Sequence, residues 1–214
     1  MRYDREHRRR RSIRLRGYDY RQPGAYFITI CTYDKSCVFG HIVEGQMQLN
    51  ECGQVVQEQW ISTAKVRPNV ELGDFVIMPN HLHAILIVGP AVGATRRVAP
   101  TNGIVGPAVG ATRRVAPTNP PRGPARGSLG AIIGQFKSMT TKRVNLRRGT
   151  PGSILWQRNY YEHVIRNEKS LNAIREYICR NPLSWASDAE NPARSDAVGD
   201  DLEEVLARIS SLDW

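Results

Sequence analysis

Hydrophobic positions along the chain recur with two periods, one of two residues, as in strands, and one near 3.6, as in helices. Runs rich in β-branched and aromatic residues predict strands at 26–32, 41–43, 47–49, 70–78 and 81–88. Apolar stripes at helical spacing predict helices at about 51–66, 128–145 and 169–181. An extended segment is predicted at 154–165, so the chain has the pattern of a mixed α and β domain.

Two histidines stand at the start of the most apolar of these strands, in the stretch Met78-Pro-Asn-His-Leu-His. Side chains alternate across a strand, so His81 and His83 are predicted to lie on one face, with Leu82 on the other. Two neighbouring imidazoles can hold one divalent metal ion and leave coordination positions open. Such an ion can polarise a phosphate, which makes this pair a candidate metal site.

The last predicted helix carries a second candidate group. Leu171, Ile174 and Ile178 form its apolar stripe, and Tyr177 lies beside the stripe. Asn181 follows Tyr177 by four residues and therefore lies over it on the same helical face. An amide oxygen there suits a metal that already has two imidazole ligands.

Charge is distributed unevenly and favours a polyanionic partner. The net charge is +10, and residues 1–21 hold nine arginines, among them Arg14 and Arg16. This arm is either a solvated tail or a segment that contacts phosphates. Lys137, Lys142 and Arg143 lie along the helix predicted at 128–145, as candidates to line a nucleic-acid groove. No apolar run is long enough to span a bilayer, and the N-terminus lacks the apolar core of a signal peptide.

Two further segments depart from the domain pattern. Residues 88–102 are repeated without change at 105–119, and the surrounding stretch 89–127 is rich in Gly and Pro, which predicts a disordered basic insert. The insert is either inert or a transient DNA contact. Residues 187–214 form an acidic tail with an amphipathic helix near 202–209, which either docks on the domain or competes with DNA for the basic surface.

Several motifs in this order are similar to one family. The stretch Met78-Pro-Asn-His-Leu-His-Ala-Ile-Leu resembles the His-hydrophobic-His signature of the HUH single-tyrosine transposases. Four other segments resemble the REP-associated tyrosine transposase branch, which is linked to repetitive extragenic palindromes of bacterial genomes: Arg14–Phe27, Ser128–Asn145, Trp156–Arg166 and Tyr177–Pro182. The resemblance spans residues 12–88 and 127–186. It divides the chain into an arm at 1–21, a transposase-like domain at 22–186 containing the insert, and the tail at 187–214.

The resemblance implies a ferredoxin-like α+β sandwich with a central antiparallel sheet. It implies an endonuclease and strand transferase, dependent on Mg²⁺ or Mn²⁺, that nicks and rejoins single-stranded DNA hairpins. In this sequence His81, His83 and Asn181 would be the metal ligands and Tyr177 the nucleophile that forms a 5′-phosphotyrosine. Tyr161 and His163 fall in a shared motif without an assigned step, as candidate DNA contacts.

Three other functions remain open at this point. One is a hairpin-binding protein that has lost catalysis, a second is a metal-dependent hydrolase that uses water, and a third is a replication initiator or relaxase relative. A bacterial cytoplasmic location is expected, with nucleoid association when DNA is bound. The chain is expected to be a monomer or a homodimer in which Tyr177 acts in cis or in trans.

Overall fold

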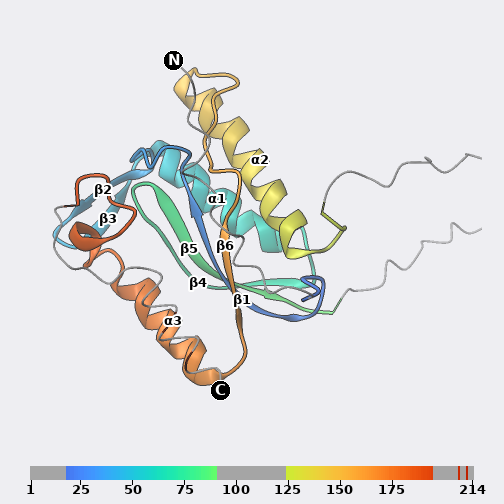
Figure 1. The fold of residues 1–214 in the computed structure, drawn as a ribbon. Coiled ribbons are helices and arrows are strands. Elements are labelled where there is room, and N and C mark those ends of the chain that lie inside the picture. Colours follow the sequence, from blue (N-terminus) through green and yellow to red (C-terminus); the bar gives the residue numbers. More distant parts are fainter. Residues whose placement is uncertain (1–17, 91–123, 195–206, 208–210, 212–214) are drawn as a thin grey trace, which may run out of the picture.

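The computed structural model describes residues 18–90 and 124–194, together with 207 and 211. The elements within these ranges are three helices, one short 3₁₀ helix and six strands. In chain order they are β1 Gly24–Cys31, β2 Gly40–Val43, β3 Gln46–Leu49, α1 Glu51–Lys65, β4 Val70–Ile77, β5 His81–Val88, α2 Leu129–Arg148, β6 Tyr161–Ile165, α3 Glu168–Arg180 and η1 Trp185–Ser187. Figure 1 shows the helices packed on a central twisted sheet.

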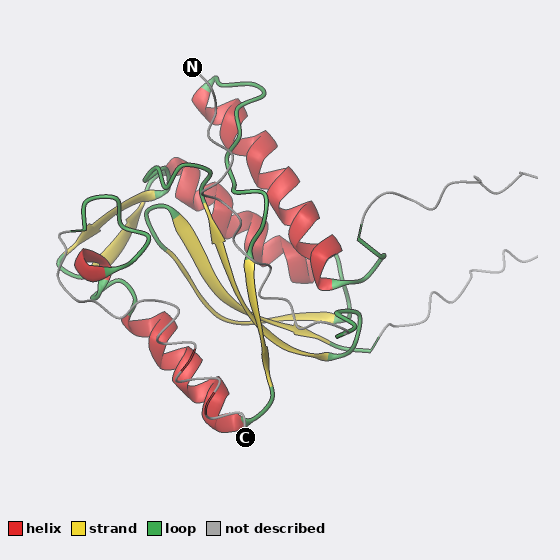
Figure 2. Cartoon of the chain, viewed as in Figure 1, coloured by secondary structure: helices red, strands yellow, loops and turns green. Residues whose placement is uncertain are grey.

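The central sheet has the strand order β4-β5-β1-β6, and every neighbouring pair is antiparallel. Without the small β2–β3 hairpin, the chain runs strand, helix, strand, strand, helix, strand, which is the ferredoxin-like arrangement. Figure 2 shows the hairpin beside one end of this sheet. The α+β class predicted from the sequence is therefore confirmed.

The two faces of the sheet carry different helices. α1 and α2 cover the face to which Ile28, Leu82 and Leu86 point, and these residues belong to the larger buried core. α3 lies on the opposite face, against Phe27 and Ile85 (Figure 1). Because strand residues alternate, one strand supplies both cores, and His83 falls on the α3 face with Ile85.

Local sequence sets the ends of the helices. The side chains of Asn50, Ser128 and Asn167 each accept a hydrogen bond from a backbone N–H in the first turn of α1, α2 and α3. Gly149 ends α2 with a φ of 65°, a left-handed conformation that favours glycine.

The predicted elements match the observed ones closely, with two differences. α2 continues to Arg148, beyond the predicted end near 145. The segment predicted as extended over 154–165 forms strand only at Tyr161–Ile165, and Trp156 makes a single bridge to Thr32. The basic arm up to residue 17, the part of the repeat region at 91–123, and the predicted tail helix apart from residue 207 lie outside the described residues.

Two helical glycines should respond oppositely to alanine. A Cβ at Gly53 would lie 2.2 Å from the carbonyl oxygen of Phe39, whereas a Cβ at Gly134 meets nothing within 4 Å. We expect Gly53→Ala to lower the free energy of unfolding by about 2 kcal/mol through the clash. Gly134→Ala should raise it by roughly 0.5–1 kcal/mol, since alanine is the better helix former. Urea unfolding of both variants measures the two effects, and equal effects would contradict the close approach of α1 to Phe39.

Candidate functional site

The two histidines of β5 form the centre of the site. His81 and His83 stand two residues apart on the α3 face, and their ring centroids are 4.5 Å apart. Both rings are buried, with at most 1% of either residue exposed. β5 is an inner strand between β4 and β1, so the backbone that carries the pair is held on both sides.

Each imidazole has an oxygen on its Nδ1 side. The Oδ1 atom of Asn80 lies 2.8 Å from Nδ1 of His81. The Oγ1 atom of Thr29 lies 2.8 Å from Nδ1 of His83, because Thr29 faces His83 across the β1–β5 pairing. The Nε2 atoms of both rings are left for other partners.

The helix α3 brings the predicted tyrosine to this pair. The Tyr177 hydroxyl lies 3.3 Å from Nε2 of His83. Phe27 contacts both candidate groups, stacked on the His83 ring at 5.6 Å and meeting the Tyr177 ring edge to face at 6.1 Å. Tyr177 and His83 are 94 positions apart in the sequence, and the fold brings them within hydrogen-bonding range.

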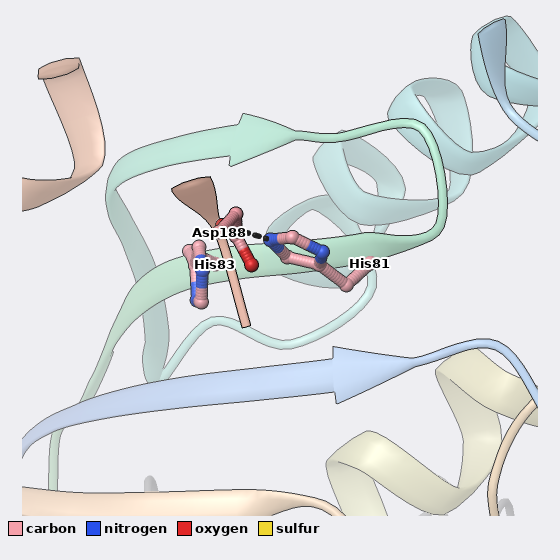
Figure 3. A group of neighbouring side chains, drawn as sticks. All are labelled: His81, His83 and Asp188. Atoms are coloured by element: carbon pink, nitrogen blue, oxygen red, sulfur yellow. Dashed lines mark ion pairs between the residues drawn. The ribbon is translucent and has the colours of Figure 1, made fainter. Parts of the chain in front are cut away.

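Asp188 completes the group and is absent from the sequence prediction. Figure 3 shows its carboxylate between the two imidazoles. Its Oδ2 atom is 3.9 Å from Nε2 of His81, and the ligand atoms of Asp188, His81 and His83 all lie within 4.8 Å of one another. Asn181 also reaches the carboxylate, since its Nδ2 donates to Oδ2 of Asp188 at 3.3 Å.

These donors fit a divalent cation. Among the described residues, Nε2 of His81 and Oδ1 of Asn181 are buried and have no hydrogen-bond partner. Buried polar atoms are normally paired, so these two atoms, beside a carboxylate and a second imidazole, are candidate ligands for an ion. Imidazole nitrogens with amide and carboxylate oxygens form a donor set that suits Mn²⁺ and similar ions.

Burial controls the protonation of the site. It lowers the pKa of His81, partly offset by Asp188 and Glu190, and it lowers the pKa of His83 well below its usual range. Burial also raises the pKa of Tyr177, and the charges of Asp188 and Glu190 act in the same direction. At neutral pH the imidazoles are therefore neutral and able to bind a cation, while the phenol keeps its proton.

The lowered pKa values of His81 and His83 predict a pH-dependent stability. Below pH 6.5 the unfolded chain takes up protons on these rings and the folded chain does not, so stability falls as the pH is lowered from 7.5 to 5.5. Each ring contributes up to about 1.4 kcal/mol per pH unit in the affected range. Thermal unfolding of the metal-free protein measures the slope, and the double variant His81→Gln, His83→Gln should give a flatter one. Equal slopes in the two proteins would contradict neutral buried imidazoles.

The other predicted contact residues are distributed over several surfaces. Tyr161 and His163 lie on β6 opposite Thr29 and Phe27, on the same sheet face as His83. Lys142 lines a groove between α2 and residues 151–158, and Arg143 lies 3.9 Å from Glu58 of α1. Arg14 and Arg16 fall outside the described residues.

Lys137 lines the same groove as Lys142. Its ammonium donates to the carbonyl oxygens of Gln157 and Asn159 at 2.8 Å each, and it lies 5.5 Å from the centre of the Tyr160 ring. Burial lowers its pKa to about 8. α2, which carries Lys137, covers the sheet face opposite α3, which carries Tyr177.

The segment after α3 covers the site. The Trp185 ring lies 6.1 Å from the His81 ring, and the Glu190 N–H donates to Oδ1 of Asp188 at 2.6 Å. Lys35 holds this segment through a 2.9 Å hydrogen bond to the carbonyl of Ala189.

Sequence reasoning predicted His81, His83, Tyr177 and Asn181, and the structure brings all four together. It missed Asp188, because the acidic residues after 187 look alike in the sequence. It also missed Thr29 and Phe27, whose role depends on the β1–β5 register. The alternation of β1 places both on one face, but only the pairing shows that His83 lies opposite.

No protein-family model matches the chain. A solved structure of the REP-associated tyrosine transposase bound to a REP hairpin aligns with 80% of this chain and 73% of its own, at 17% identity and a TM-score of 0.48. A protein of Haemophilus influenzae, described only as uncharacterized, is 40% identical over 180 residues, which are 84% of this chain and 91% of that protein. The chain belongs to the same family as this Haemophilus influenzae protein.

Proposed function

We propose that the chain is a metal-dependent nuclease and strand transferase that cleaves single-stranded DNA through a covalent bond to Tyr177. The observation that carries the proposal is the 3.3 Å distance between the Tyr177 hydroxyl and Nε2 of His83, beside a second imidazole and a carboxylate. A nucleophile next to a metal-binding cluster is the arrangement that phosphoryl transfer needs. The motif resemblance described above points to the same chemistry.

The cation would be held by Nε2 of His81 and His83 with an oxygen from Asn181 or Asp188. When bound, Mg²⁺ or Mn²⁺ supplies positive charge that polarises the scissile phosphate. Phe27 and the α3 backbone hold the Tyr177 ring in place for attack. The Tyr177 oxygen forms a bond to phosphorus, the bond to the 3′ oxygen breaks, and the phenolic proton ends on that 3′ oxygen. The products are a 5′-phosphotyrosine and a free 3′-OH.

Two properties of the chain support DNA as the substrate. The net charge of +10 provides a sequence-independent attraction for phosphates. Helix α2 has no acidic side chain among its twenty residues, and it ends with Arg147 and Arg148. A single strand or hairpin flank leaves its phosphodiester accessible, and its bases can stack on aromatic side chains.

End-labelled DNA tests the proposal. The full chain is incubated with Mn²⁺ and a pool of hairpin oligonucleotides that have randomised single-stranded flanks. We expect a band resistant to SDS that carries the 3′-end label, because the protein retains the 5′-phosphate fragment, while the 5′-end label leaves with the free 3′-OH. Cleavage without this band would indicate water as the nucleophile, and binding without cleavage would indicate a silent hairpin-binding protein.

A further inference from the structure

We infer that Asn80 and Thr29 are positioning residues that hold a proton on Nδ1 of each imidazole and so commit both Nε2 atoms to the cation. This inference rests on the proposed function, because it assigns the ligand atoms of the same site. Asn80 is 1% exposed, and its side-chain amide contacts three segments of the chain.

The partners of Asn80 identify the two ends of its amide. One end lies 2.9 Å from the carbonyl oxygen of Lys35 and 2.6 Å from that of Glu190. Carbonyl oxygens only accept hydrogen bonds, so this end must be the NH₂ group. The atom that faces His81 at 2.8 Å is therefore the amide oxygen, which also only accepts.

This orientation determines the tautomer of His81. Since Oδ1 of Asn80 cannot donate, Nδ1 of His81 must carry the proton and donate it. In the neutral ring Nε2 then holds a lone pair, and this is the atom that is buried without a hydrogen-bond partner and faces Asp188. Metal-binding histidines commonly donate their other N–H to an oxygen in this way, which fixes the ring and its tautomer.

The His83 ring is arranged in the same way as the His81 ring. His83 has the Thr29 hydroxyl at 2.8 Å from Nδ1 and the Tyr177 hydroxyl at 3.3 Å from Nε2. Both hydroxyls can donate or accept. We assign the donor role to the phenol and the acceptor role to Thr29, because metal-binding histidines donate their second N–H to an oxygen. Both Nε2 lone pairs then point to the space shared with Asp188 and Tyr177. Thr29 and Asn80 come from different elements, and together they aim the two rings at one point.

The first test reads the tautomers directly. Long-range ¹H–¹⁵N correlation spectra of the ¹⁵N-labelled full chain, without metal at pH 7.5, distinguish a protonated Nδ1 from a protonated Nε2. His81→Gln and His83→Gln spectra assign the two signals. We expect protonated Nδ1 in both rings, and the loss of this signature for His83 in Thr29→Val, which removes the hydroxyl and keeps the shape. A protonated Nε2 in either wild-type ring would overturn the inference.

The second test measures Mn²⁺ affinity from the electron paramagnetic resonance signal of the free ion. Loss of a residue that supports a metal ligand weakens binding about 10- to 100-fold, which is the expectation for Asn80→Ala and Thr29→Val. Thr29→Ser keeps the hydroxyl and should restore the wild-type affinity. Thr32→Val, at the residue that follows β1, is the matched control, because this buried threonine donates to the carbonyl of Ser36 and not to a histidine.

The outcomes separate this inference from the proposed function. Neither measurement uses DNA, so a chain with the expected tautomers and graded affinities that forms no covalent adduct contradicts the proposed function alone. Wild-type protein that binds no Mn²⁺, or equal affinities for Thr29→Val and Thr29→Ser, would overturn the inference. If Asn80→Ala does not fold, the three threonine variants and the wild-type spectra still test the inference.

Discussion

Replacement of Tyr177 by phenylalanine is expected to abolish the covalent DNA adduct and to lower cleavage by at least about 10³-fold. The change removes only the attacking oxygen. The ring should keep its edge-to-face contact with Phe27 at 6.1 Å, so α3 stays docked on the sheet. The measurement is the rate of SDS-resistant band formation with 3′-labelled hairpin DNA and Mn²⁺.

A matched tyrosine on the other side of the sheet serves as the control. Tyr160 packs against the larger core, and the Lys137 ammonium lies over its ring. Tyr160→Phe should form the adduct at the wild-type rate. Cleavage that survives in Tyr177→Phe without an adduct would assign the attack to water, and an adduct that persists would place the nucleophile on another residue.

Replacement of His83 by glutamine is expected to weaken Mn²⁺ binding by about 100-fold and to reduce cleavage at moderate Mn²⁺ by a similar factor. The imidazole is central to the site, with Thr29 on its Nδ1 side and Tyr177 on its Nε2 side. Glutamine is similar in size and can still bond Thr29, so the loss should come from the missing ligand nitrogen. Cleavage measured across a Mn²⁺ titration gives both effects.

His41→Gln is the comparison for this variant, because His41 is exposed on β2 and belongs to no described cluster near the site. Its affinity and cleavage should remain at wild-type values. Part of the lost activity in His83→Gln should return at high Mn²⁺ concentration, because mass action refills a weakened site. A variant that keeps the wild-type Mn²⁺ affinity would remove His83 from the ligand set.

The sequence was sufficient to predict the framework of the site. The period of two in β5 placed His81 and His83 on one face, and the four-residue offset in α3 placed Asn181 over Tyr177. Both predictions depend on local backbone geometry, which is the same in every strand or in every helix. The motif resemblance then related the two elements to each other, which no local pattern can do.

What the sequence could not predict depends on contacts between distant segments. Asp188 reaches the imidazoles because the chain turns back after Pro182, and no periodic signal marks that turn. Lys137 was predicted to line a groove, but its bonds to the carbonyl oxygens of residues 157–159 could not be predicted, because that segment has no periodic pattern. In each case the chemistry of a side chain depends on where an irregular segment lies.

The alternation of β5 assigns neighbouring positions to separate tasks. His81 and His83 face the reactive groups, whereas Leu82 and Ala84 pack into the core beneath α1 and α2. The stability of the fold and the chemistry of the site can therefore be changed by separate substitutions within a single strand. Substitutions at the core-facing positions can be chosen to raise fold stability without replacing either histidine.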